Sequence, residues 1–335
     1  MAEHELIVAA EIEIPISSPQ KVIFPELGVT KLDLVTYYLS VADAAVGHLR
    51  DRPTVLKRFA DGAAKKPFFQ KRIPDSAPEW LQTTIVQFPS GRSARELLPN
   101  DAAHLVWGVN LGVIDWNPWQ VRLPDLDHPD ELRVDLDPTP EASWDDVRQV
   151  ALVAGAVLRD HGLTGYPKTS GSRGIHINVR ILPEHDFVTV RRAAVALARE
   201  IERRAPEIAS SKWWKEERHG VFVDFNQNLR DRTVASAYSV RPTPDARVST
   251  PLAWNEVATV DPASLRIDTV PARLAEHGDP SADIDDHPGS LTQLLALAQR
   301  DEDDGLPDAP WPPHFKKQPG EPSRVVPSRA KRPPA

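Results

Sequence analysis

A six-residue stretch, residues 133–138 (RVDLDP), constrains the fold of this chain more than any other segment. Alternation of polar and apolar residues is typical of a β-strand, and the proline indicates where the strand ends. Asp135 and Asp137 are therefore expected on one face, while Val134 and Leu136 enter a core. Two carboxylates this close repel each other unless a cation lies between them. The stretch predicts a site for an oxygen-preferring divalent ion, Mn²⁺ or Mg²⁺.

A third acid extends this prediction. Asp224 lies in the apolar run VFVDF, which is typical of a buried strand, where a carboxylate needs a partner or a metal. Three carboxylates at strand ends can hold two divalent ions about 3.5–4 Å apart, an arrangement that suits phosphoryl transfer. The alternative is that each aspartate caps a strand or pairs with an arginine. For a D-x-D motif on its own, that alternative is favoured.

A turn rich in glycine and serine, residues 170–176 (SGSRGIH), leads into an alternating, strand-like run. Backbone N–H groups and hydroxyls in such a turn can surround phosphate oxygens, and Arg173 and His176 add further donors. Arg241, just before a proline turn, is well placed to reach a triphosphate. The alternatives are an ordinary surface loop and a structural salt bridge. The spacing of a Walker loop is absent, which argues against an ATPase.

A basic segment near the N-terminus contains adjacent aromatic residues, Phe68 and Phe69, followed by Lys71. Paired aromatics among basic residues are typical of a platform on which nucleic-acid bases stack. The alternative is that both rings are core residues. Adjacent residues of a strand face opposite ways, so at least one ring is expected in the core.

The composition excludes several classes of protein. The 335 residues contain no cysteine, which rules out disulfides, cysteine-ligated zinc and cysteine nucleophiles and fits a reducing compartment. No apolar run is long enough to span a bilayer, and the acidic N-terminus is unlike a secretory signal, so a cytoplasmic protein is expected. The net charge of −8 argues only weakly against nucleic acid, because acidic and basic residues are segregated along the chain.

Helical and strand-like patterns interleave along the chain. Helices are expected over 32–50, 144–161 and 187–204, a hairpin over 54–72, and strands within 105–123, 175–181 and 221–225. These patterns predict an α+β or α/β body with a mixed sheet behind a basic N-terminal region. One domain over 1–300 is expected, with its two halves meeting near 130. The acidic, then proline-rich segment 301–335 is predicted to be disordered.

Taken in order, these motifs resemble the polymerase domain of bacterial ligase D, a member of the archaeo-eukaryotic primase superfamily. The shared motifs are D-x-D, S-G-S-R-G-I-H, V-D-F-N-Q-N around Asp224 and Y-S-V-R ending at Arg241, with N-terminal counterparts around residues 17–31, 56–59 and 68–71. The resemblance spans roughly residues 15–300, and the combined order is far more specific than any one motif. It implies an α+β fold in which mixed and antiparallel sheets are flanked by helices. The catalytic core would be RRM-like, preceded by an N-terminal α/β module.

The resemblance also implies residue roles. The metal ligands and catalytic residues would be Asp135, Asp137 and Asp224. The nucleotide would be held by Ser170, Ser172, Arg173, His176, Arg241, Lys57 and Asn117. DNA would be bound by Lys21, Lys31 and Ser18 at a 5′-phosphate, and by Phe68, Phe69 and Lys71. Asn117 stands where relatives often carry histidine, and Ser18 where they carry asparagine.

The implied function is template-directed nucleotidyl transfer that fills short gaps in DNA during end joining or base excision repair, with two-metal catalysis and a preference for ribonucleotides and Mn²⁺. The implied partners are gapped or primer–template DNA with a 5′-phosphate, an NTP or dNTP, and a DNA ligase; the protein would be a monomer at the nucleoid. A stand-alone relative is expected, such as the ligase C-associated primase-polymerases of actinobacteria. A metal-dependent nuclease and a non-catalytic module that binds single-stranded or gapped DNA are the alternatives. The phosphate-binding turn argues against the first, and the three acids argue against the second.

Overall fold

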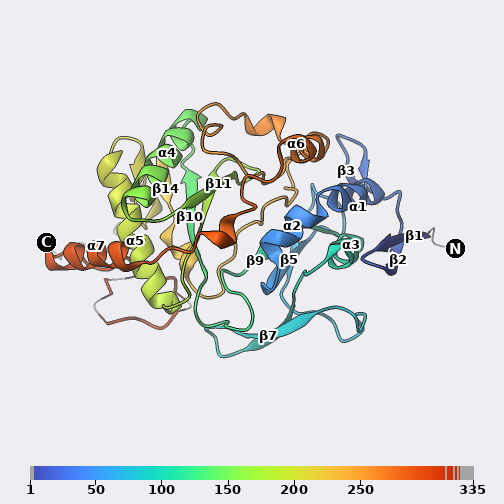
Figure 1. Cartoon of the computed structure of the whole chain (residues 1–335), viewed down its shortest axis with the longest axis horizontal. Helices are drawn as coiled ribbons and strands as arrows, with labels where there is room; N and C mark the ends of the chain where they lie inside the picture. The colour runs from blue at the N-terminus through green and yellow to red at the C-terminus, as the bar shows by residue number, and fades with distance from the viewer. Residues whose placement is uncertain (1–3, 314, 320, 323, 325–335) are drawn as a thin grey trace, which may run out of the picture.

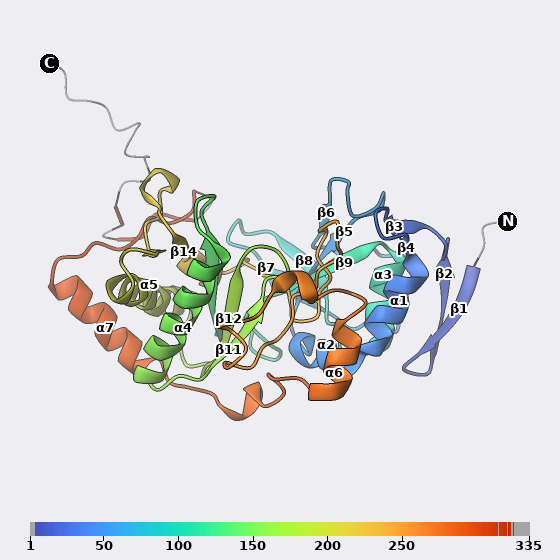
Figure 2. The same ribbon diagram turned by 90° about the horizontal axis from the view of Figure 1, so that it is seen from above.

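Two five-stranded sheets lie side by side and define an N-terminal part (residues 4–130) and a C-terminal part (from residue 131). The computed structural model describes residues 4–313, 315–319, 321, 322 and 324. Figures 1 and 2 show the β1–β2 hairpin at one end of the molecule and helix α7 at the other. None of the helices in this described range is both long and apolar enough to cross a lipid bilayer.

The N-terminal part is built on an antiparallel sheet in which β5 pairs with β6, β8 and β9, and β7 pairs with β8. The strands outside this sheet are β1 (His4–Ala9), β2 (Ile12–Ser17), β3 (Val22–Phe24) and β4 (Val29–Thr30). The strands of the sheet are β5 (Thr54–Arg58), β6 (Phe68–Gln70), β7 (Thr83–Gln87), β8 (Ser93–Leu97) and β9 (Val113–Pro118). The helices are α1 (Lys31–Ser40), α2 (Ala42–Leu49) and α3 (Ala102–Asn110).

The N-terminal elements agree with the sequence prediction in part. Thr30 begins α1 through a capping box with Asp33, and the helix expected over 32–50 divides at Val41. The hairpin over 54–72 is present as β5 and β6. Of the strands expected within 105–123, only the one at residues 113–118 is present, because Asp101 caps a helix over residues 102–110. Every side chain from His104 to Val109 is buried, so the sequence there has no periodicity to separate helix from strand.

The C-terminal part follows the order βαββαβ, with one additional two-residue strand, β13, before the last strand. Its strands are β10 (Glu131–Pro138), β11 (Gly165–Thr169), β12 (Ile175–Arg180), β13 (Ala209–Ser210) and β14 (Val221–Val223). They lie in the order β11-β12-β10-β14-β13, with β10 antiparallel to β12 and to β14. This is the arrangement of RRM-like and ferredoxin-like sheets. The α+β fold with an RRM-like core, expected from the sequence, is therefore confirmed.

Two long helices cover one face of this sheet (Figure 2). They are α4 (Trp144–Asp160), which begins at a capping box between Ser143 and Asp146, and α5 (Phe187–Arg204), capped by Asp186. The helices expected over 144–161 and 187–204 are therefore present, and Gly162, whose φ is +72°, follows the end of α4. Val134 and Leu136 are buried, as the alternation of β10 predicted. The carboxylates of β10 consequently lie on the face that the helices leave open.

The chain after β14 contains two helices, α6 (Val270–His277) and α7 (Thr292–Asp303). It also contains three short 3₁₀ helices, η2 (Phe225–Asn228), η3 (Pro262–Ser264) and η4 (Ile284–Asp286), while η1 (Lys215–Glu217) precedes β14. Residues 304–313, here called the C-terminal strap, then turn back across α5 (Figure 2). The described residues after 301 thus differ from the predicted disordered tail. Trp311 is buried against the arginine at position 191 of α5, a contact that composition alone does not reveal. Residues 325–335 lie outside the described residues.

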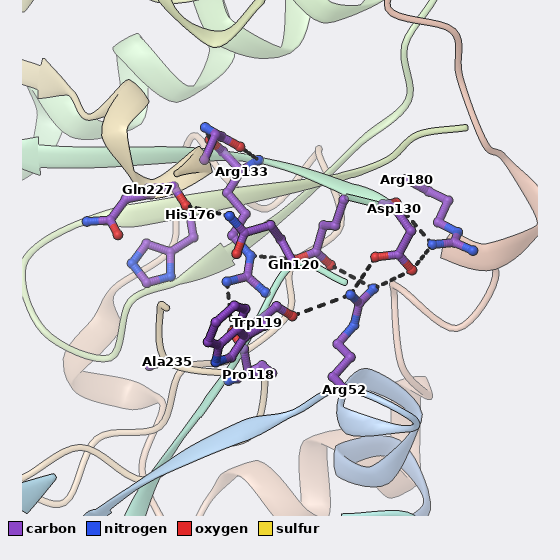
Figure 3. A network of polar contacts seen from close by, with 12 residues as sticks. Arg52, Pro118, Trp119, Gln120, Asp130, Arg133, His176, Arg180, Gln227 and Ala235 are labelled. Carbon is purple, nitrogen blue, oxygen red and sulfur yellow. Dashed lines mark hydrogen bonds and ion pairs between the residues drawn. The ribbon is translucent and has the colours of Figure 1, made fainter. Parts of the chain in front are cut away.

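A buried network of charges joins the two parts (Figure 3). Arg52, before β5, donates two hydrogen bonds of 2.6 and 3.1 Å to Asp130, and Arg180 of β12 pairs with the same carboxylate. Arg133 donates to Glu131 at 2.6 Å and to the carbonyl of Pro118 in β9 at 2.8 Å. Because removing one partner of a buried ion pair leaves a costly unpaired charge, this network holds the two sheets in a fixed relation.

Candidate active site

Three carboxylates meet at the open face of the C-terminal sheet. Asp135 and Asp137 come from β10, and Asp224 follows β14 directly, with its amide donating to the carbonyl of Asp135 at 2.8 Å. One carboxylate oxygen from each lies within 4.8 Å of the others. Asp135 is 6% exposed, Asp224 is partly buried and Asp137 is open to solvent. The sequence therefore predicted correctly that these three side chains gather, although Asp224 lies after its strand and not within it.

The electrostatics of this cluster favour a bound cation. Burial, reinforced by Asp137 and Asp224, raises the pKa of Asp135 well above its usual range. Burial together with Asp137 raises the pKa of Asp224 to about 6, and loss of surrounding water raises the pKa of Asp137. The buried Oδ1 of Asp135 has no hydrogen-bond partner among the described residues. Three carboxylates, one with an unsatisfied oxygen, fit the preferences of Mg²⁺ or Mn²⁺.

A row of polar side chains crosses the sheet beside the acids. Asp135 stands opposite His176 in the register of β10 and β12, and His176 stands opposite Lys168 of β11. The Nε2 of His176 is 3.3 Å from Asp135, and the Nζ of Lys168 is 2.7 Å from its Nδ1. Burial, together with Arg241, lowers the pKa of Lys168 to about 7, and burial and Lys168 lower that of His176. The neighbouring cations disfavour a charged imidazole, so His176 faces the cleft as a neutral side chain.

The glycine-bearing turn is organised by its own first serine. The Oγ of Ser170 accepts hydrogen bonds from the amides of Ser172 at 3.2 Å and Gly174 at 3.0 Å. Gly171 has a φ of +68°, and a side chain there would meet the Cγ of Arg241 at 2.4 Å. Glycine at this position therefore permits both the backbone conformation and the close approach of Arg241. Arg173 is exposed and donates to the carbonyl of Thr139 at 3.0 Å.

Asp115 pairs with two cationic side chains at the site. Its fully buried carboxylate lies 3.4 Å from the ammonium of Lys57 and 3.4 Å from the guanidinium of Arg241. Asn117 donates to the same carboxylate at 3.2 Å. The salt-bridge alternative considered for Arg241 is therefore present, but Arg241 also lines the cleft described next.

A cleft of about 440 Å³ brings these groups together. Asp135 and Asp137 line it together with hydrogen-bond donors from both parts of the chain. The residues predicted to bind nucleotide all line it: Lys57, Asn117, Ser170, Ser172, Arg173, His176 and Arg241. Phe69 and Gln227 line it as well, and the amide of Gln227 donates to Asp224 at 3.1 Å. An acidic cluster next to a cluster of cations and hydroxyls is the arrangement that metal-assisted chemistry on a polyphosphate requires.

The predicted DNA-binding lysines lie outside this cleft, near the start of α1. The buried ammonium of Lys31 donates to the carbonyls of Ser17 and Asn110, and that of Lys21 donates to the carbonyl of Ala60. No carboxylate in the described ranges forms an ion pair with either lysine. Burial and the nearby Lys21 lower the pKa of Lys31. Ser18 is exposed in the same loop with a φ of +50°.

Both rings of the aromatic pair are exposed to solvent. Phe68 is 61% exposed and Phe69 is 55% exposed, so the expectation that at least one ring enters the core was wrong. Both lie on β6, a three-residue strand at the edge of its sheet. The ammonium of Lys57 lies 5.4 Å from the Phe69 ring. Lys71 is engaged within the protein, pairing with Asp231.

Sequence reasoning missed Lys168 and Asp115. Lys168 stands two residues before the turn that begins at Ser170, and period-two counting would have placed it on the face of the site. Asp115 is an acid inside the apolar run VIDW, the same signal that drew attention to Asp224.

Comparison with known proteins gives consistent matches. Residues 30–281 match the family model described as LigD, primase-polymerase domain. The multifunctional non-homologous end joining protein LigD of Mycolicibacterium smegmatis is 32% identical over 291 residues, 85% of this chain and 38% of that protein. The corresponding protein of Pseudomonas aeruginosa is 31% identical over 297 residues, 87% of this chain and 35% of that protein. The chain thus spans well under half the length of these relatives.

A solved structure matches as well. The polymerase domain from Mycobacterium tuberculosis ligase D, in complex with DNA, superposes with a TM-score of 0.76 at 30% identity. The match covers 82% of this chain and 99% of that domain.

Proposed function

The chain belongs to the LigD primase-polymerase domain family, nucleotidyltransferases of the archaeo-eukaryotic primase superfamily, and we propose that it extends a DNA primer across short gaps during DNA repair. The observation that carries this proposal is the cleft in which Asp135 and Asp137, with Asp224 beside them, face Arg241, His176 and the turn that begins at Ser170. A binding protein would gain nothing from three acids that repel the DNA backbone.

Each side of the cleft has a distinct task in this reaction. Asp135, Asp137 and Asp224 hold two divalent ions, which supply charge neutralisation at the reacting phosphate. Arg241, Arg173, Ser172 and His176 hold the triphosphate of the incoming nucleotide, with Ser170 shaping the turn. Lys57 and Asn117, both anchored on Asp115, complete the nucleotide site. Catalysis then rests on positioning and fixed electrostatics, as in other phosphoryl transfers.

The N-terminal part supplies the DNA contacts. Lys21 and Lys31 are two close ammonium groups without an ion-pair partner in the described part of the chain, which suits the 5′-phosphate at the downstream side of a gap, with Ser18 beside them. Phe68 and Phe69 offer exposed rings for base stacking. Lys71 can contribute only after it leaves Asp231. The protein works as a monomer with a DNA ligase, in the cytoplasm at the nucleoid.

Ribonucleotides and Mn²⁺ are the preferred substrate and metal in this proposal. A site that hydrogen-bonds the 2′-hydroxyl leaves polar groups unpaired when a dNTP binds, which costs roughly 1–3 kcal/mol. NTPs should therefore be incorporated about tenfold or more faster than matching dNTPs.

A one-nucleotide gap with a 5′-phosphate, supplied with a labelled NTP and its dNTP in competition with Mn²⁺ or Mg²⁺, tests the proposal. Templated extension by wild type and its loss in Asp135→Asn support a polymerase. Shortening of the DNA strands would mark a nuclease. Binding without extension would mark a non-catalytic DNA-binding module. Equal use of NTP and dNTP would remove the ribonucleotide preference alone.

A further inference from the structure

Arg191 of α5 is a buried arginine that joins the C-terminal strap to the segment carrying Asp224. Its side chain is 1% exposed. On one side its Nε donates to the side-chain oxygen of Asn226 at 2.7 Å. On the other side it donates to Asp308 at 2.9 Å and to the carbonyl of Ala309 at 2.9 Å. One guanidinium thus connects two segments more than 80 residues apart in sequence.

Two aromatic rings lie close to the guanidinium. It lies 4.4 Å from the ring of Trp311 in the strap and 5.4 Å from the ring of Phe225 in η2. The indole of Trp311 in turn donates to Asp308 at 2.8 Å, so the strap presents its carboxylate and its ring together. A planar group fixed by hydrogen bonds in its plane and by rings against its faces has little freedom to turn.

Asn226 links Arg191 to the acidic cluster through hydrogen bonds to both. Its backbone amide donates to the Oδ1 of Asp224 at 2.9 Å. Its side chain is buried, and its oxygen accepts from Arg191, while its Nδ2 has no partner among the described residues. Arg191 is therefore the group that orients the Asn226 side chain, and with it the start of η2 beside the carboxylate.

We propose that Arg191 and the C-terminal strap are positioning elements for the metal ligand Asp224, a role that rests on the proposed metal site. The strap lies beyond residues 30–281, the range matched by the family model. Groups that orient a metal ligand typically change metal affinity or activity by about 10–100-fold when removed. We expect about a tenfold loss of Mn²⁺ affinity when the strap no longer engages Arg191.

The test compares full-length variants. Asp308→Ala with Trp311→Leu releases the strap, and Arg191→Lys keeps the charge but cannot reach both sides. The matched control is Arg192→Lys, because Arg192 is adjacent on α5 but pairs with Glu302 and Gln299 of α7. Mn²⁺ affinity is measured from the free-ion electron paramagnetic resonance signal. Thermal melting is recorded with and without Mn²⁺.

The expected result is weaker Mn²⁺ binding and a smaller Mn²⁺-dependent rise in melting temperature in both test variants, with wild-type behaviour in the control. Saturating Mn²⁺ should restore extension. Lower melting temperatures with unchanged Mn²⁺ affinity would overturn the proposal, because the strap would then only cover α5. If Arg191→Lys fails to fold, the strap variant decides alone. Absence of Mn²⁺ binding in wild type would instead refute the proposed metal site.

Discussion

Neutralising Asp224 should stabilise the metal-free protein, although it should destroy the metal site. In the folded chain, burial and the nearby Asp137 raise the pKa of Asp224 to about 6, compared with 3.8 for an unperturbed aspartate. Above pH 6 the folded protein holds a carboxylate that would be more stable in the unfolded chain. Asparagine keeps an oxygen that can accept from the amide of Asn226 and loses the 3.1 Å hydrogen bond from the side chain of Gln227, so Asp224→Asn removes the charge at the cost of one hydrogen bond.

The magnitude follows from the difference between these two pKa values. At 1.36 kcal/mol for each pH unit, ionising Asp224 costs the folded state up to about 3 kcal/mol at neutral pH. Because the side chain is only partly buried, solvent screening reduces this, and we expect about 1–2 kcal/mol. With an unfolding entropy of about 2.1 cal/mol/K per residue, this corresponds to a melting temperature about 1–3 °C higher at pH 7.5.

The direction of the pKa shift of Asp224 determines how the stability difference depends on pH. The folded-state pKa is raised, so the cost is absent below pH 3.8, grows as the pH rises toward 6 and is complete above it. Differential scanning calorimetry in a chelator from pH 4 to 8 should therefore show wild type and Asp224→Asn converging at the acid end. Addition of Mn²⁺ should reverse the order at pH 7.5, since only wild type gains binding energy. The exposed Asp61→Asn is the control. A variant less stable than wild type in chelator at pH 7.5 would refute the reasoning.

Three further outcomes are expected. Asp135→Ala should abolish primer extension while gapped-duplex affinity, measured by fluorescence anisotropy, stays largely unchanged; near wild-type extension would exclude Asp135 as a ligand. The double variant Lys21→Ala, Lys31→Ala should reduce the ratio of affinities for a gap with a 5′-phosphate and one with a 5′-hydroxyl by about tenfold or more, since each charge-assisted contact contributes about 1.5–3 kcal/mol. An unchanged ratio would show that the 5′-phosphate binds at other residues. Burial opposes ionisation of Glu131, but Arg133 and Arg52 lower its pKa to about 2. Glu131→Gln should therefore be less stable than wild type by up to about 3 kcal/mol at pH 7, and this difference should shrink as the pH falls from 4.5 toward 2. A constant difference in the free energy of urea unfolding across that pH range would contradict this.

The features that could be predicted from the sequence are those determined by residues close together along the chain. The alternation through Asp135 and Asp137 depends on neighbouring residues alone, and so do the caps at Thr30 and Ser143. Asp135 and Asp137 therefore lie on one face of β10, as the alternation predicted. The helix at 102–110 was missed because uniform burial removes the periodicity on which a local prediction depends.

Other features are set by partners far away in the sequence. Lys168 matters because strand register brings it opposite His176, and Asp115 matters because Lys57 and Arg241 converge on it. Trp311 lies in a proline-rich segment whose order depends on Arg191, 120 residues earlier. No window of neighbouring residues contains that information.

The buried charge network between the two sheets has a consequence for how the cleft accepts substrate. The cleft takes Lys57 and Asn117 from one sheet and the acids from the other, while Arg52, Asp130 and Arg180 lock the sheets together nearby. Hinging the sheets apart would strip buried charges of their partners. We therefore expect a rigid cleft of preset width, in which a mismatched nucleotide is rejected because it does not fit and not because a domain fails to close over it.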